Sequence, residues 1–214
     1  MPTITLKNTV YKNKLLLDFL DHSTELSPFH NGSSLEIIDE HFMSNRDLHI
    51  DQRKFLVNAL VSQYNSIGVE TPSGVHQLKK KGVYTVTTGH QLCFMGGPQF
   101  FIHKIISTIK SCQLLKEKYS QNDFIPVFWM ASEDHDFQEI SHTTIFGKKF
   151  SIEDTHDTIA VGRLKSSVFQ SLHEEVKEFF KTDEKFKILE DLFEKAMSFD
   201  SWSKTTRFWV HHLF

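Results

Sequence analysis

The sequence predicts an α/β protein built on an open parallel sheet with helices on both faces, preceded by a helical segment. Two short runs rich in apolar and β-branched residues, 83–88 and 124–131, are separated by an amphipathic stretch of helical length. This order is typical of a β-α-β unit, whose crossover is almost always right-handed. With 214 residues, 39% of them hydrophobic, the chain is long enough to bury a core without disulfides or a structural metal.

The first 80 residues are predicted to be helical and to pack on a core formed by residues 81–214, a single compact unit. Apolar residues cluster over 15–20, and they recur at helical spacing over 55–64. Gly68 is suited to end the second of these helices, since Pro72 follows closely.

The core is predicted to start with a strand over 83–88, a helix from Pro98 to about Tyr119, and a second strand over 124–131. The second strand is an almost continuous apolar run, which favours burial on both faces of a sheet. Pro126 should then lie near its start, where a missing backbone donor does little harm.

The rest of the chain is predicted to be mainly helical. A weaker strand is expected over 143–146, helical structure over 166–196, and a last amphipathic helix over 202–214. Because the sequence stops on apolar and aromatic residues, we expect this core to be incomplete.

Composition excludes several classes of protein. The net charge is −3 and no long basic run occurs, so neither a nucleic acid nor an anionic membrane surface is an expected partner. The polar N-terminus and the lack of an apolar stretch of about 20 residues argue against export and membrane spanning. Two cysteines, Cys93 and Cys112, are expected to stay reduced, which favours the cytoplasm.

A first polar cluster follows the first strand. Glycines before a helix start let backbone amides approach a phosphate or carboxylate, and a lysine two turns into the helix would add positive charge. The other interpretation is a tight strand-to-helix turn beside a solvated lysine. The residues are Gly89, His90, Gln91, Gly96, Gly97, Pro98 and Lys104.

A second polar cluster, Glu133, Asp134, His135 and Asp136, follows the second strand, with Glu139 slightly further on. Crowded carboxylates raise one another's pKa and that of a neighbouring histidine, which suits proton transfer near neutral pH. The other interpretations are a divalent-cation site and a polar loop whose aspartates cap the next element. Because ligands bind beyond the carboxyl ends of parallel strands, we expect both clusters to border one crevice.

The sequence predicts no structural metal site. His90 and Cys93 are three residues apart, but no second pair of ligands has zinc-finger spacing. Cys93 is expected to be a buried, inert thiol rather than a nucleophile, and Cys112 to lie in the core.

Taken together, the motifs resemble the family of bacillithiol-biosynthesis cysteine-adding enzymes, BshC. The resemblance rests on Thr88–Gln91, Gly96–Pro98, Lys104 and the run Pro126–Phe137, and it extends over essentially the whole chain. It implies a Rossmann-like core related to class I synthetases, in a cytoplasmic ligase that adds cysteine to the amino group of glucosaminyl malate. Family members are longer, so the chain resembles an N-terminal portion, and homodimerisation through a C-terminal coiled coil is implied.

Two departures from the family pattern matter. The family usually has Gln where this chain has His90, and the ATP-binding histidine signature of class I synthetases is missing. ATP or another adenine nucleotide is therefore expected by analogy alone.

In the ligase hypothesis, Gly96, Gly97 and Lys104 would hold a phosphoanhydride. His135, tuned by Glu133, Asp134 and Asp136, would take the proton from the attacking amine. The alternative is a metal-dependent hydrolase or a sugar-phosphate-binding module that uses the acidic cluster.

Overall fold

The computed structural model of the chain describes residues 13–21, 23–29, 38–153 and 158–214. The chain divides into two compact units, Met1–Asp47 and Leu48–Phe214. The first unit contains α1 (Lys14–Leu20), the short 3-10 helix η2 (Ser27–Phe29) and α2 (Glu40–Ser44). Asn13 caps α1 by accepting a hydrogen bond from the Leu16 amide at 3.0 Å, which confirms the helix predicted there.

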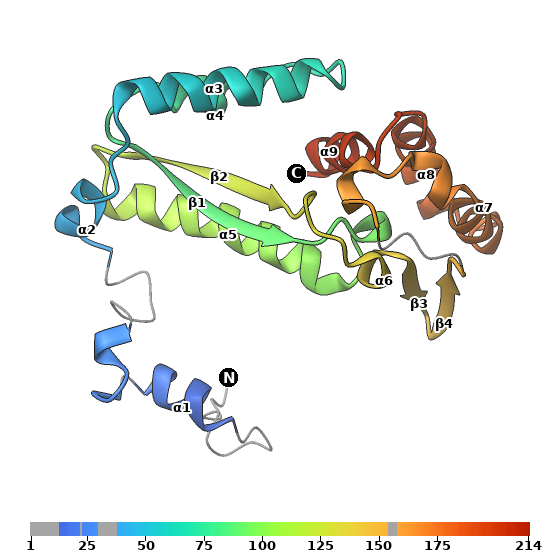
Figure 1. Ribbon diagram of the computed structural model, residues 1–214, viewed down its shortest axis with the longest axis horizontal. Helices are drawn as coiled ribbons and strands as arrows, with labels where there is room; N and C mark the ends of the chain where they lie inside the picture. Colours follow the sequence, from blue (N-terminus) through green and yellow to red (C-terminus); the bar gives the residue numbers. More distant parts are fainter. Residues whose placement is uncertain (1–12, 22, 30–37, 154–157) are drawn as a thin grey trace. The chain divides into compact units, whose positions relative to one another are not determined.

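The second unit contains the predicted β-α-β unit (Figure 1). Strands β1 (Val83–His90) and β2 (Asp123–Met130) are parallel, and α5 (Gln99–Lys118) connects them. Their register runs from Val83 opposite Asp123 to His90 opposite Met130. Both strands therefore end at the same edge of the sheet.

Helices cover both faces of this sheet, as predicted (Figure 1). Helices α3 (Ile50–Asn65) and α4 (Ser73–Gln77) pack on Val83 and Ile125. These two helices belong to the unit that contains the sheet, whereas the sequence predicts them as part of a helical segment 1–80. On the other face, the ring of Phe101 in α5 lies 4.9 Å from that of Phe128.

The prediction that the second strand is buried on both faces is wrong. None of the residues of β2 is fully buried, and Trp129 is 60% exposed. Within the described residues the sheet has two strands, so β2 is an edge strand and only part of its surface is covered. Pro126 is the fourth residue of β2 rather than near its start, and an edge position tolerates a residue without an amide proton.

A small hairpin follows the short helix α6 (Phe137–Ile140). The strand predicted over 143–146 is β3 (His142–Ile145), but its partner is β4 (Lys148–Ser151) in a separate antiparallel sheet. The turn uses Phe146 and Gly147 with φ of 48° and 79°. Positive φ at both turn residues is the geometry of two-residue hairpins.

The C-terminal part is helical and lies beyond the carboxyl ends of β1 and β2 (Figure 1). The segment predicted as helical over 166–196 divides near Asp183, which caps the next helix by accepting from the Lys185 amide at 2.8 Å. Among the described residues, no helix has the length and apolar character needed to cross a membrane. The elements are η5 (Val161–Arg163), η6 (Ser166–Phe169), α7 (Gln170–Phe179), α8 (Glu184–Met197) and α9 (Trp202–Leu213).

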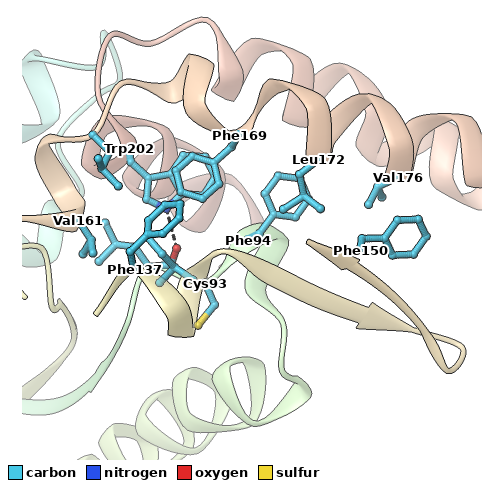
Figure 2. Close-up of a cluster of buried hydrophobic side chains, with 12 residues drawn as sticks. Cys93, Phe94, Phe137, Phe150, Val161, Phe169, Leu172, Val176 and Trp202 are labelled. Carbon is cyan, nitrogen blue, oxygen red and sulfur yellow. Dashed lines mark hydrogen bonds between the residues drawn. The ribbon is translucent and has the colours of Figure 1, made fainter. Parts of the chain in front are cut away.

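An aromatic core joins this part to the loops after the strands (Figure 2). Trp202 stacks on Phe169 with ring centroids 3.7 Å apart. The Trp202 indole donates a hydrogen bond to the Leu92 carbonyl at 2.7 Å, so the loop after β1 is anchored to α9. This core positions the loops that carry both predicted polar clusters.

Candidate functional site

The two predicted polar clusters meet at the carboxyl ends of β1 and β2. The Ala131 amide donates to the His90 carbonyl at 3.1 Å, which extends the pairing one step beyond the strands. Just past this point, the Gln91 side-chain amide donates a hydrogen bond to the Asp134 carboxylate. The loops after the two strands are therefore neighbours, but none of the residues of the first cluster lines the cavity beside the second, so this cavity is not the crevice predicted between them.

The loop after β2 is held in place by η5. The Val161 amide donates to the Asp134 carbonyl at 2.7 Å, and the Gly162 amide donates to the Ser132 carbonyl at 2.9 Å. A Cβ on Gly162 would lie 2.5 Å from the Ser132 Cβ and 2.8 Å from the Ser132 carbonyl oxygen. Only glycine allows this approach without displacement of the backbone.

A cavity of 470 Å³ opens between this loop and η5. Glu133 and His135 line it, together with Arg163 from η5 and the hydroxyl-bearing residues Ser132 and Ser203. A carboxylate, an imidazole and a guanidinium around one cavity can hold an anionic group and exchange a proton with a ligand. Arg163 and Ser203 were not identified from the sequence, because neither lies in a motif and only tertiary packing brings them to the loop.

Asp134 and Asp136 have structural partners. Asp134 accepts from the His135 amide at 2.7 Å and from Gln91, and these donors lower the pKa of its carboxyl group. The expectation that crowding raises the pKa values of the carboxylates is therefore wrong for Asp134. Asp136 caps α6 by accepting a hydrogen bond from the Glu139 amide at 3.1 Å. This confirms, for Asp136, the alternative in which an aspartate of this loop caps the next element.

The glycine turn after β1 does not present the amides predicted for an anion. The Gly96 amide donates to the Cys93 carbonyl at 3.3 Å, and the Gly97 amide donates to the Phe94 carbonyl at 3.1 Å, within the 3-10 turn η4 (Phe94–Gly96). Pro98 is the N-cap of α5 rather than its first helical residue.

Packing explains the two glycines. A Cβ on Gly96, whose φ is +70°, would lie 3.1 Å from the Trp209 ring, and one on Gly97 would lie 2.8 Å from the Thr143 hydroxyl oxygen. The Lys104 ammonium donates to the Gly89 carbonyl at the end of β1. The sequence predicts that Gly96, Gly97 and Lys104 hold a phosphoanhydride. The structure does not fit this prediction, because the two amides and the ammonium group already have partners within the protein.

The two cysteines are buried, as the sequence predicts. Burial, and then the charge of Glu139, raise the pKa of Cys93 to about 12. Burial likewise raises the pKa of Cys112 to about 11. Thiols with such pKa values are poor nucleophiles at neutral pH.

The acidic cluster does not form a metal site in the part of the chain that the structure describes. There, the donor atoms of three metal-ligating side chains gather only at His90, Cys93 and Glu139. None of the residues from Glu133 to Asp136 belongs to this group. The hydrolase alternative, which depended on the acidic cluster, therefore has no support from the geometry.

Comparison with known proteins gives a consistent result over the whole chain. Residues 1–214 match the family model for the N-terminal Rossmann-like domain of BshC, described as bacillithiol biosynthesis. A relative from Christiangramia forsetii, named "Putative cysteine ligase BshC", is 36% identical, and the match covers 100% of this chain and 42% of the relative.

Two Flavobacterium proteins with the same name are also similar. The protein from F. psychrophilum is 39% identical over 78% of this chain and 32% of its own length. The protein from F. johnsoniae is 42% identical over 70% of this chain and 30% of its own length. The chain thus spans less than half the length of these curated relatives.

Proposed function

The chain belongs to the BshC family of bacillithiol biosynthesis, as its N-terminal Rossmann-like domain, and we propose that it carries part of the active site of a cytoplasmic cysteine ligase. The proposed reaction joins the carboxyl group of cysteine to the amino group of glucosaminyl malate. The relatives are named putative cysteine ligases, which supports the reaction class, and the cavity beside His135 supports the place where the reaction occurs.

The observation that carries this proposal is that Glu133, His135 and Arg163 line the same cavity. Amide formation requires the acceptor amine to attack an activated carboxyl carbon. A C–N bond forms, the activating group leaves, and the amine loses a proton. His135 supplies the imidazole at this cavity, and histidine is the side chain that most often transfers protons in enzymes, so it is suited to accept that proton.

Arg163 is assigned to substrate binding. Cysteine and glucosaminyl malate both carry carboxylates, and a guanidinium binds a carboxylate through two parallel hydrogen bonds. Gly162 keeps Arg163 close to the loop after β2, because a side chain at position 162 would collide with Ser132.

The test uses the longest polypeptide that contains this sequence, incubated with cysteine, glucosaminyl malate and ATP. Bacillithiol is measured by thiol labelling and mass spectrometry. We expect His135→Ala to lower the rate at least about tenfold, because a positioned general base contributes on the order of 100-fold or more. Arg163→Ala is expected to raise the KM for one of the two carboxylate substrates.

The matched control is His103→Ala, which removes an exposed histidine of α5 outside the cavity. This variant is expected to keep the wild-type rate. If His135→Ala and His103→Ala turn over equally fast, His135 is not the base, and the cavity does not hold the reacting amine.

A further inference from the structure

Three potential metal ligands meet on the side of the β1 loop that faces α6. His90 is the last residue of β1, Cys93 precedes η4, and Glu139 lies in α6. One ligand atom from each of the three lies within 4.8 Å of the others. His90 and Cys93 alone did not predict a metal site, since the third ligand comes 46 residues later and reaches them only in the folded chain.

The distance between His90 and Cys93 suits a shared metal ion. Zinc binds sulfur at about 2.3 Å and imidazole nitrogen at about 2.0–2.1 Å, and at a tetrahedral angle these bonds place the two atoms about 3.6 Å apart. The Cys93 Sγ and His90 Nδ1 atoms are 3.6 Å apart. Glu139 is exposed, so its side chain can adjust to bring one carboxylate oxygen to the same centre.

The surrounding packing holds the two inner ligands in place. Cys93 is 1% exposed and belongs to the aromatic core of Figure 2. The His90 ring packs against the Phe101 ring with centroids 5.4 Å apart. Packing thus holds Cys93 and His90 in place, and the exposed side of the site, at Glu139, is where an ion can enter.

We propose that His90, Cys93 and Glu139 bind one Zn²⁺ ion. A thiolate, an imidazole and a carboxylate form a mixed ligand set that zinc accepts, whereas magnesium and calcium prefer oxygen alone. Three protein ligands leave the fourth tetrahedral position open to water or to a ligand. Binding releases the Cys93 thiol proton to solvent, and His90 coordinates through unprotonated Nδ1, which lies 3.2 Å from the Gln91 carbonyl oxygen.

The experiment uses the whole chain, stripped with a chelator and then titrated with Zn²⁺ or Co²⁺. We expect about one zinc per chain after gel filtration, measured by mass spectrometry of the metal. The cobalt form should show a thiolate-to-cobalt charge-transfer band in the near ultraviolet. Since only sulfur produces that band, binding at exposed histidines does not mimic it.

Cys93→Ser should abolish the band, and the matched control Cys112→Ser, at the other buried cysteine, should keep it. Glu139→Gln, at an exposed position, should fold normally and weaken zinc binding at least tenfold. Even a residue that only hydrogen-bonds to a metal ligand contributes about 10–100-fold to metal affinity, and a direct ligand should contribute no less. The proposal is overturned if the wild-type chain shows no cobalt–thiolate band, if the band depends on Cys112, or if Glu139→Gln binds zinc as the wild type does.

Discussion

Gly162→Ala tests how tightly η5 must approach the loop after β2. The new Cβ would lie 2.5 Å from the Ser132 Cβ, 2.8 Å from its carbonyl oxygen and 3.0 Å from its Cα. All three atoms belong to the backbone or its first side-chain carbon, so no rotamer change relieves the overlap. The two segments must therefore separate.

The expected cost follows from two contributions. Overpacking at a well-packed position costs about 1–3 kcal/mol. Separation also weakens the hydrogen bonds from the Val161 and Gly162 amides, each worth about 0.5–1.5 kcal/mol. We expect Gly162→Ala to lower the free energy of unfolding by about 2–4 kcal/mol, which lowers the urea midpoint by about 1 M.

The assay is urea unfolding followed by tryptophan fluorescence, because Trp202 and Trp209 are both buried in the unit that contains η5. Gly74→Ala is the matched control. Its Cβ would lie 3.3 Å from the Ile125 Cγ2 methyl and 3.4 Å from its Cδ1 methyl, and α4 gains a better helix former. If Gly162→Ala and Gly74→Ala unfold within 0.5 kcal/mol of each other, on the order of an ordinary surface change, η5 does not constrain the loop.

Two further predictions concern the core and the pH dependence of stability. Trp202→Phe should lower the free energy of unfolding, measured with urea, by about 2–4 kcal/mol. The buried Leu92 carbonyl loses its donor, and the smaller ring leaves a cavity. The exposed Trp129→Phe should change the free energy of unfolding by less than about 0.5 kcal/mol. If Trp202→Phe and Trp129→Phe have equal effects, the hydrogen bond from Trp202 does not anchor the loop after β1. Burial lowers the pKa of His173, so the unfolded state binds more protons than the folded state, and the urea midpoint should fall as pH drops below about 6.5. His173→Gln should reduce this fall, and an unchanged pH profile would show that His173 does not cause it.

The sequence contained strong signals for the parallel β-α-β unit. A run rich in β-branched residues over 83–88, an apolar run over 124–131 and a helical pattern between them are local signals, and the folded chain has a strand or helix at each of them. The meeting of Gln91 with Asp134 followed from one topological rule, since parallel neighbours end at the same edge.

Other features depended on long-range packing. The apolar run in β2 predicted burial, but burial depends on which elements cover the strand, and Trp129 remains exposed at the edge. The glycines at 96 and 97 were attributed to an anion, but their neighbours Trp209 and Thr143 come from distant segments. Sequence spacing carries no information about such contacts.

The β-α-β unit, its parallel pairing and the family were determined by the sequence itself, because they follow from local patterns and from motifs that are continuous along the chain. Only the tertiary structure decided which side chains share a site. Arg163 joins Glu133 and His135, and Glu139 joins His90 and Cys93, through contacts between separate segments. The physical reason is that chemistry at a site requires donor atoms a few ångströms apart, and those distances are set by packing and hydrogen bonds between segments that are distant in the sequence.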